Sequence, residues 1–280
     1  MIWELQKTKG NRTYRFKTRN TVIPDKELIK ITQNISDGIP SMSLKDYFAC
    51  KMHVLNDCDH LVVGFDENEN AIATLSSNWY KSKSYLFLHL ETMIIVEEYQ
   101  RSLTARHLLG CLFGALYKIH KIFPTYISLK SYNARAYSIM HRFSNMGLED
   151  VKAYPDLVFP EKSMNIELIK EFSETLCPNL PLNENTCVIY GASGDVPNDL
   201  WKKLPETREN VVNQYFSKHL TSNDRMLCVL DSSNMESKKK ILKIIEAVES
   251  TEIELLNEQN IGIELIKANE SHQILTNLAK

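Results

Sequence analysis

The chain of 280 residues contains no apolar run that approaches the length of a membrane span. Its first residues, Met1 to Lys7, lack the apolar core of a signal peptide. Its formal net charge of −2 gives no bulk attraction to a polyanion such as a nucleic acid. We therefore expect a cytoplasmic protein whose partners include neither a membrane nor a nucleic acid.

Cysteines with metal-ligand spacing are also missing. The six cysteines are scattered and none forms a C-x-x-C pair: Cys50, Cys58, Cys111, Cys177, Cys187 and Cys228. Such cysteines are typical of reduced, mostly buried thiols in a cytosolic protein. Because no cluster of histidines and cysteines has zinc-ligand spacing, we expect no metal. Internal repeats and low-complexity segments are absent as well.

Strand and helix patterns run through the chain, which divides near residues 155–163. Its length has room for one large or two small domains. Before the division, the patterns predict strands over 13–16, 61–65, 71–75, 85–96 and 124–129, and helices over 25–35, 44–55 and from residues 107 and 133 onward. After it, they predict strands over 186–190 and 226–230, and helices over 206–220 and 236–248. The fold class is therefore α/β with a mixed sheet, in a domain of residues 1–160 and a smaller α/β region of residues 161–280.

The most informative segment, residues 85–116, combines a strand, a short basic turn and a helix. Leu86, Leu88 and Leu90 alternate with more polar neighbours, which is the period of a strand. A helix that opens just after a strand leaves backbone N–H groups unpaired in its first turn, and its dipole favours an anion there. With added charge from Arg101 and Arg106, the turn predicts a site for a phosphate or pyrophosphate.

Residues 96–109 resemble the acyl-CoA signature of the GNAT N-acetyltransferase superfamily, Q/R-x-x-G-x-G/A. Gln100 fills the first position and Ala105 the last, while Leu103 stands where a glycine usually lets the backbone approach the pyrophosphate. The predicted hairpin of residues 61–75 precedes this segment. The strand of residues 124–129 and the helix led by Asn133 follow it, and this is the order of the elements in the family. The resemblance covers roughly the first 160 residues. It implies a mainly antiparallel sheet that splays where the Glu91 strand meets the strand of residues 125–129.

The resemblance implies acetyl-CoA, or another acyl-CoA, as co-substrate. The backbone of the strand end would pair with the pantetheine arm, and N–H groups of the turn would contact the pyrophosphate. The implied coenzyme-binding residues are Ile94, Ile95, Val96, Gln100, Arg101, Ser102, Leu103, Thr104, Ala105, Arg106 and Asn133. A solvated basic turn is the alternative for the charged positions, and a plain helix N-cap is the alternative for Asn133.

The resemblance also suggests catalytic and acceptor residues. Glu91 would serve as general base, directly or through water, if its pKa is raised. Tyr137 would protonate the departing thiolate. Trp79, Tyr80 and His89 would line the acceptor site. The alternative for Trp79, Tyr80 and Tyr137 is ordinary packing. The alternative for Glu91 and His89 is a polar pair on a strand face.

Together these features favour an enzyme, an acyl-CoA-dependent N-acyltransferase that moves acetyl to an amine by direct attack in a ternary complex. The acceptor would be a small-molecule or peptide amine. The alternative is a non-catalytic or acyl-carrier-binding protein of the same fold, with the C-terminal region as an interaction module. A Gly-rich stretch at residues 191–194 lacks the Lys-Ser/Thr ending of a phosphate loop, so we interpret it as a turn.

Overall fold

The computed structural model describes residues 2–7, 12–19, 21–100, 102–120, 124–145, 151–159, 164–194, 196, 200–201 and 204–233. Arg101, the predicted end of the Asn133 helix near Gly147, and the predicted helix over residues 236–248 lie outside these ranges. Within them, no helix is long and apolar enough to cross a membrane. The same ranges hold no group of three or more His, Cys, Asp and Glu side chains placed to hold a metal ion.

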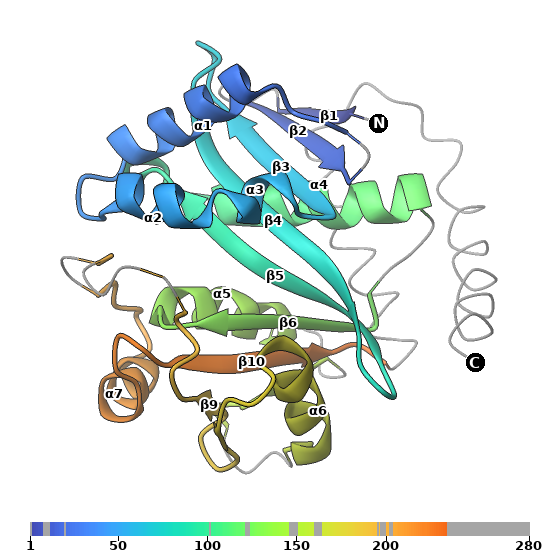
Figure 1. Ribbon diagram of the computed structural model, residues 1–280, viewed down its shortest axis with the longest axis vertical. Helices are drawn as coiled ribbons and strands as arrows, with labels where there is room; N and C mark the ends of the chain where they lie inside the picture. The colour runs from blue at the N-terminus through green and yellow to red at the C-terminus, as the bar shows by residue number, and fades with distance from the viewer. Residues whose placement is uncertain are drawn as a thin grey trace.

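A ten-stranded sheet forms the centre of the structure (Figure 1). Its strands are β1 (Ile2–Lys7), β2 (Arg12–Thr18), β3 (His60–Phe65), β4 (Ala71–Lys81), β5 (Leu86–Ile95), β6 (Tyr126–Ser131), β7 (Lys152–Tyr154), β8 (Leu182–Asn183), β9 (Val188–Ile189) and β10 (Arg225–Asp231). They are ordered β1-β2-β3-β4-β5-β6-β10-β9-β8, and β7 pairs with β10. The β5–β6 pair is parallel and the other pairs are antiparallel. The predicted α/β class with a mixed, mainly antiparallel sheet is confirmed.

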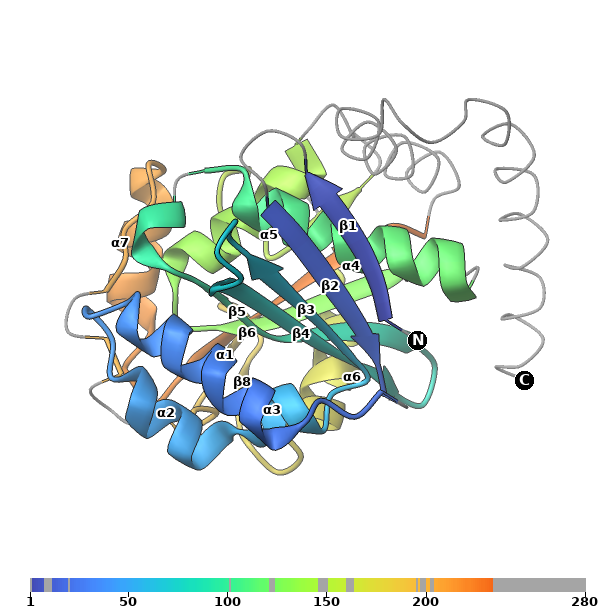
Figure 2. The same ribbon diagram turned by 90° about the horizontal axis from the view of Figure 1, so that it is seen from above.

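Helices cover both faces of this sheet. They are α1 (Asp25–Asp37), α2 (Leu44–Lys51), α3 (His53–Asn56), α4 (Thr104–His120), α5 (Ala134–Asn145), α6 (Ile166–Leu176) and α7 (Asn210–His219), with a short 3₁₀ turn over Glu97–Tyr99. Figure 2 shows α1 and α2 on one side of β2–β5 and α4 on the other. Helix α4 buries Leu108, Leu112 and Leu116 at helical spacing against the sheet. On the opposite face, α1 buries Ile31 and Ile35 in a second apolar cluster.

Several predicted elements differ from the observed ones in length. The strand predicted over residues 71–75 continues to Lys81, because its polar residues Ser76, Ser77 and Asn78 are paired with β5 although they interrupt the apolar pattern. The helix predicted over residues 44–55 is divided into α2 and α3. Helix α7 starts later than predicted, because the N–H of Thr207 donates to the side chain of Asn213 instead of joining a helical turn.

The sheet splays between β5 and β6, as the resemblance implies. The two strands pair only over Leu88–Leu90 and Ile127–Leu129. Beyond these residues β5 and β6 diverge, and Figure 1 shows them well apart at the left of the view. Glu91 lies at the start of the divergence. It is also the extra residue of a bulge, because Ser76 of β4 pairs with Thr92 and Ser77 pairs with Leu90.

The region after residue 160 adds to the same sheet. Strand β10 pairs with β6 over Met226–Asp231. Phe172 of α6 stacks on Phe87 of β5, with their ring centroids 3.8 Å apart. The domain boundary near residue 160 stays a prediction, but strands from both sides of it share one hydrogen-bonded sheet.

Candidate active site

The strand register places a set of polar side chains on one face of the sheet at the splay. In the antiparallel β4–β5 pair, Tyr80 lies opposite Phe87 and Asn78 lies opposite His89. Opposite residues share a face, so these side chains project to the same side as Glu91. The α6 side chain Phe172 packs on this face as well. The bulge at Glu91 directs its carboxylate toward Tyr80 and Asn78.

Two donors hold the Glu91 carboxylate in place. The Tyr80 hydroxyl donates to Oε1 over 2.8 Å, and the Asn78 amide donates to the same oxygen over 3.2 Å. The side chain is 18% exposed. Burial alone would raise the pKa of Glu91, but His89, these two hydrogen bonds and Lys130 together hold that pKa below its ordinary value. Glu91 is therefore a carboxylate at neutral pH, and the raised pKa assumed for a strong general base is not found.

His89 lies beneath Glu91, with its imidazole buried. Its Nδ1 is 2.8 Å from the hydroxyl of Ser128 on β6. Burial lowers the pKa of His89 to about 4, although the charge of Glu91 opposes the shift. The imidazole is thus neutral at pH 7, and its 4.0 Å contact with Glu91 is not an ion pair. His89 is 1% exposed and lies between Glu91 and Ser128, and its role at an acceptor site stays a prediction.

Two further residues, Tyr47 and Arg225, lie near the splay, and no sequence motif marks either of them. Tyr47 of α2 is buried and makes a hydrogen bond with Thr92, the residue after Glu91. Arg225 begins β10 and lies over the ring of Tyr132, 5.5 Å from its centroid. Neither residue belongs to a local motif. Tyr47 reaches the site from a helix and Arg225 from a distant strand, so only the tertiary fold could reveal them.

The turn after β5 is held by side chains. Gln100 donates to the carbonyl of Ile95 over 2.9 Å and accepts from Arg135 of α5 over 3.0 Å. Ser102 donates to the carbonyl of Tyr99 over 2.6 Å and accepts from the N–H of Thr104 over 3.2 Å. Ser102 thus satisfies one of the N–H groups at the start of α4.

The predicted phosphate residues that the structure describes lie just before α4 and in its first turn. Leu103 is 56% exposed, so its side chain points away from the core. Ala105 and Arg106 lie in the first turn of α4 and are half-buried. The Nε of Arg106 is buried and has no hydrogen-bond partner among the described residues. A buried, unpaired guanidinium N–H at a helix N-terminus fits an anion.

Three predicted site residues have clear structural roles. Asn133 accepts from the N–H of Arg135 over 2.9 Å and so caps α5. Tyr137 is fully buried, donates to the carbonyl of Pro155 and accepts from the N–H of Leu157. Trp79 lies opposite Leu88 and therefore on the other face of the sheet from Glu91 and Tyr80. A catalytic or binding role for these three residues stays a prediction.

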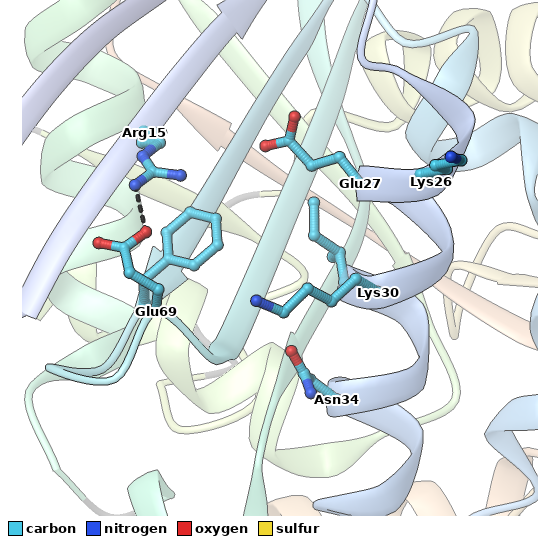
Figure 3. Close-up of a pocket in the computed structure, with 8 residues that line it drawn as sticks. Arg15, Lys26, Glu27, Lys30, Asn34 and Glu69 are labelled. Carbon is cyan, nitrogen blue, oxygen red and sulfur yellow. Dashed lines mark hydrogen bonds and ion pairs between the residues drawn. The ribbon is translucent and has the colours of Figure 1, made fainter.

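A separate hollow of about 450 Å³ lies between α1, β2 and the β3–β4 hairpin (Figure 3). Arg15 pairs there with Glu69, and its guanidinium lies 4.3 Å from the centroid of the Phe65 ring. Figure 3 shows the side chains of Glu27 and Lys30 pointing from α1 toward the hollow. None of the predicted coenzyme or catalytic residues lines this hollow.

Neither a protein-family model nor a curated protein sequence matches the chain. Among solved structures, it is similar to a GNAT-family acetyltransferase from Staphylococcus aureus Mu50, with a TM-score of 0.30 and 14% identity over 50% of this chain and 84% of the other. A ribosomal-protein alanine acetyltransferase from Vibrio fischeri matches with a TM-score of 0.32 and 12% identity over 52% and 82%. A GNAT-family acetyltransferase from Bacillus anthracis matches with 0.33 and 10% over 51% and 81%. The TM-scores are low, so these matches do not decide what the chain does.

Proposed function

We propose that the protein is an acyl-CoA-dependent N-acyltransferase that transfers acetyl from acetyl-CoA to an amine. The observation that carries the proposal is the divergence of β5 from β6 at Glu91, directly before the turn that opens α4. The divergence leaves one edge of β5 without a partner strand among the described residues. An extended ligand arm can pair with such an edge as an added strand would.

The residues along this edge fit acetyl-CoA. The backbone of Ile94, Ile95 and Val96 would pair with the pantetheine arm. The first turn of α4 would receive the pyrophosphate, with Arg106 as its charged partner. Leu103 stands beside this approach where the signature has a glycine, and its side chain is 56% exposed. Bound there, the coenzyme supplies an activated thioester for attack by the amine.

Glu91 would then orient the attacking amine. Its ionised carboxylate accepts hydrogen bonds from Tyr80 and Asn78 through one oxygen, Oε1. The second oxygen can accept from an ammonium or amine held at the thioester. When the nitrogen attacks the carbonyl carbon and the carbon–sulfur bond breaks, the nitrogen must lose a proton. Glu91 or a water bound to it would receive that proton.

Titration of the purified full chain with acetyl-CoA in a calorimeter tests this proposal, followed by an assay of free thiol release with a panel of amines. We expect saturable binding of acetyl-CoA and amine-dependent release of coenzyme A. Binding without turnover on any amine would favour the non-catalytic alternative. No binding of acetyl-CoA or of a longer acyl-CoA would contradict the proposal and leave an acyl-carrier partner to be tested.

A further inference from the structure

Arg225 is a half-buried cation whose side chain donates to backbone carbonyls. It lies at the start of β10, where its Nη1 donates to two backbone carbonyls, those of Ser222 over 2.8 Å and Asp224 over 2.6 Å. Among the described residues, no carboxylate lies within ion-pair distance of its guanidinium. The guanidinium has five N–H donors, so most of its hydrogen-bonding capacity stays open.

The nearest carboxylate in sequence makes its hydrogen bonds to other residues, although its charge also acts on Arg225. Asp224 accepts from the N–H of Gly191 through Oδ1, and from the N–H and hydroxyl of Thr221 through Oδ2. It therefore organises the loop before β10, and the guanidinium of Arg225 bonds to carbonyls of the same loop. Burying a charge without a partner is costly, so an arginine in this position is suited to a ligand anion.

Arg225 lies on the same face as Glu91, on the other side of the splay. Ser128 of β6 contacts His89, and Lys130 lies on the same face of β6 as Ser128. Lys130 lies opposite Leu227 in the β6–β10 pair, so Arg225, two residues earlier, projects to the same side. Figure 1 shows β10 beyond β6 as seen from β5. Two strand spacings put the backbones of Glu91 and Arg225 at least about 10 Å apart.

Tyr47 of α2 lies within electrostatic range of both charges. Burial raises the pKa of its hydroxyl, the charge of Glu91 raises it further, and the charge of Arg225 lowers it. Both charged groups therefore act on one hydroxyl of α2. Lys130 of β6 donates to the sulfur of Cys177 at 3.3 Å, whereas Arg225 donates to backbone carbonyls and keeps further N–H groups for a ligand.

We propose that Arg225 binds a carboxylate of the amine acceptor, so that the acceptor is an amino acid or short peptide with a free carboxyl group. This inference rests on the proposed acyltransferase function. The amine would lie against Glu91 and the carboxylate against Arg225, with Tyr47 and Tyr132 between them. A planar guanidinium fits a carboxylate through two parallel hydrogen bonds, which an ammonium cannot provide.

The test compares acids with their uncharged analogues. Purified full-length protein, acetyl-CoA and a thiol-release assay are used with glycine, β-alanine, γ-aminobutyrate and glycylglycine, each beside its own amide. The value of kcat/KM is expressed per concentration of neutral amine, because an acid and its amide differ in amine pKa. We expect at least one acid to be preferred over its amide by about tenfold or more.

Variants assign that preference to Arg225. Arg225→Gln should lower kcat/KM for the preferred acid by about tenfold to a hundredfold and leave the amide within about twofold. Arg225→Lys should fall between them, because it keeps the charge and loses the fork. Arg142→Gln is the matched control, since Arg142 is exposed and pairs with Glu209. Circular dichroism and the Kd for acetyl-CoA verify that each variant is folded.

The outcomes separate this inference from the function on which it rests. Equal use of acids and amides by the wild-type protein would overturn the inference and leave the acyltransferase function standing. An equal loss on acid and amide in folded Arg225→Gln would overturn it as well. If acetyl-CoA does not bind, or no amine releases coenzyme A, the proposed function itself fails. Where Arg225→Gln does not fold, Arg225→Lys carries the assignment, and the lack of an acid preference in the wild-type protein still overturns the inference.

Discussion

At Glu91, a carboxylate is held by two donors on a strand bulge, with a pKa below its ordinary value. We expect Glu91→Gln to lower turnover by about a hundredfold, because removal of a positioned proton acceptor costs that order of rate. The Kd for acetyl-CoA should change little. Because the wild-type carboxylate is ionised throughout, the activity between pH 5 and pH 9 should follow the ionisation of the amine, and the deficit of the variant should shrink at high pH.

The matched control for this prediction is Glu174→Gln on α6, which removes an exposed carboxylate on the same side of the sheet. It should leave both turnover and binding unchanged. Unaltered turnover of Glu91→Gln at neutral pH would show that Glu91 is structural and that water or the substrate itself accepts the proton.

A second prediction at the residue scale concerns His89 and the pH dependence of folding stability. Its pKa is about 4 in the folded protein against about 6.5 in an unfolded chain, so the unfolded state binds the extra proton between these values. Folding stability should therefore be intact above pH 6.5 and fall as the pH drops from 6.5 to 4, by at most roughly 3 kcal/mol for this residue. In His89→Gln, urea unfolding at pH 7.0, 5.5 and 4.5 should show a flatter dependence.

Replacement of the exposed His53 by glutamine serves as the control and should keep the wild-type slope. Parallel slopes for His89→Gln and the wild-type protein would mean that the buried imidazole accepts a proton in the folded state.

At the scale of elements, the proposed anion site of the β5–turn–α4 unit combines the N-terminus of α4 with a buried Arg106 Nε that has no hydrogen-bond partner among the described residues. Arg106→Glu should raise the Kd for acetyl-CoA about tenfold or more and reduce the dependence of binding on salt, since one attraction becomes a repulsion. Calorimetric titration at low and high salt measures both. Lys26→Glu makes the same charge change on α1, across the sheet, and should leave the Kd near that of the wild-type protein. Equal effects of the two substitutions would point to bulk charge and place the pyrophosphate elsewhere.

At the scale of the whole molecule, the sheet is shared by segments from both sides of residue 160. Without β10, strand β6 would be an edge strand with Ile127 and Leu129 uncovered on it. Loss of Phe172 would remove the ring stacked on Phe87. We therefore expect the fragment of residues 1–160 to lack a cooperative thermal transition, whereas the fragment of residues 1–233 should retain one. Calorimetry of both fragments and the full chain decides this. A cooperative transition of the shorter fragment near that of the full chain would instead establish the two-domain division.

The sequence by itself determined the elements whose signal is local. The alternation around Leu88 and the apolar spacing of Leu108, Leu112 and Leu116 define β5 and α4 from neighbouring residues alone, because strand and helix periods are short-range properties. The turn between these elements and its anion-binding potential follow from the same local order.

The tertiary structure decided everything that depends on register. It put Trp79 on the far face and committed Tyr137 to the core. It also lowered the pKa of Glu91 through His89 and through the donors from β4, against the effect of burial. It also brought Tyr47 and Arg225 near the splay from remote segments of the chain. Contacts across strands and between layers could not be predicted, because they leave no periodic pattern in the sequence.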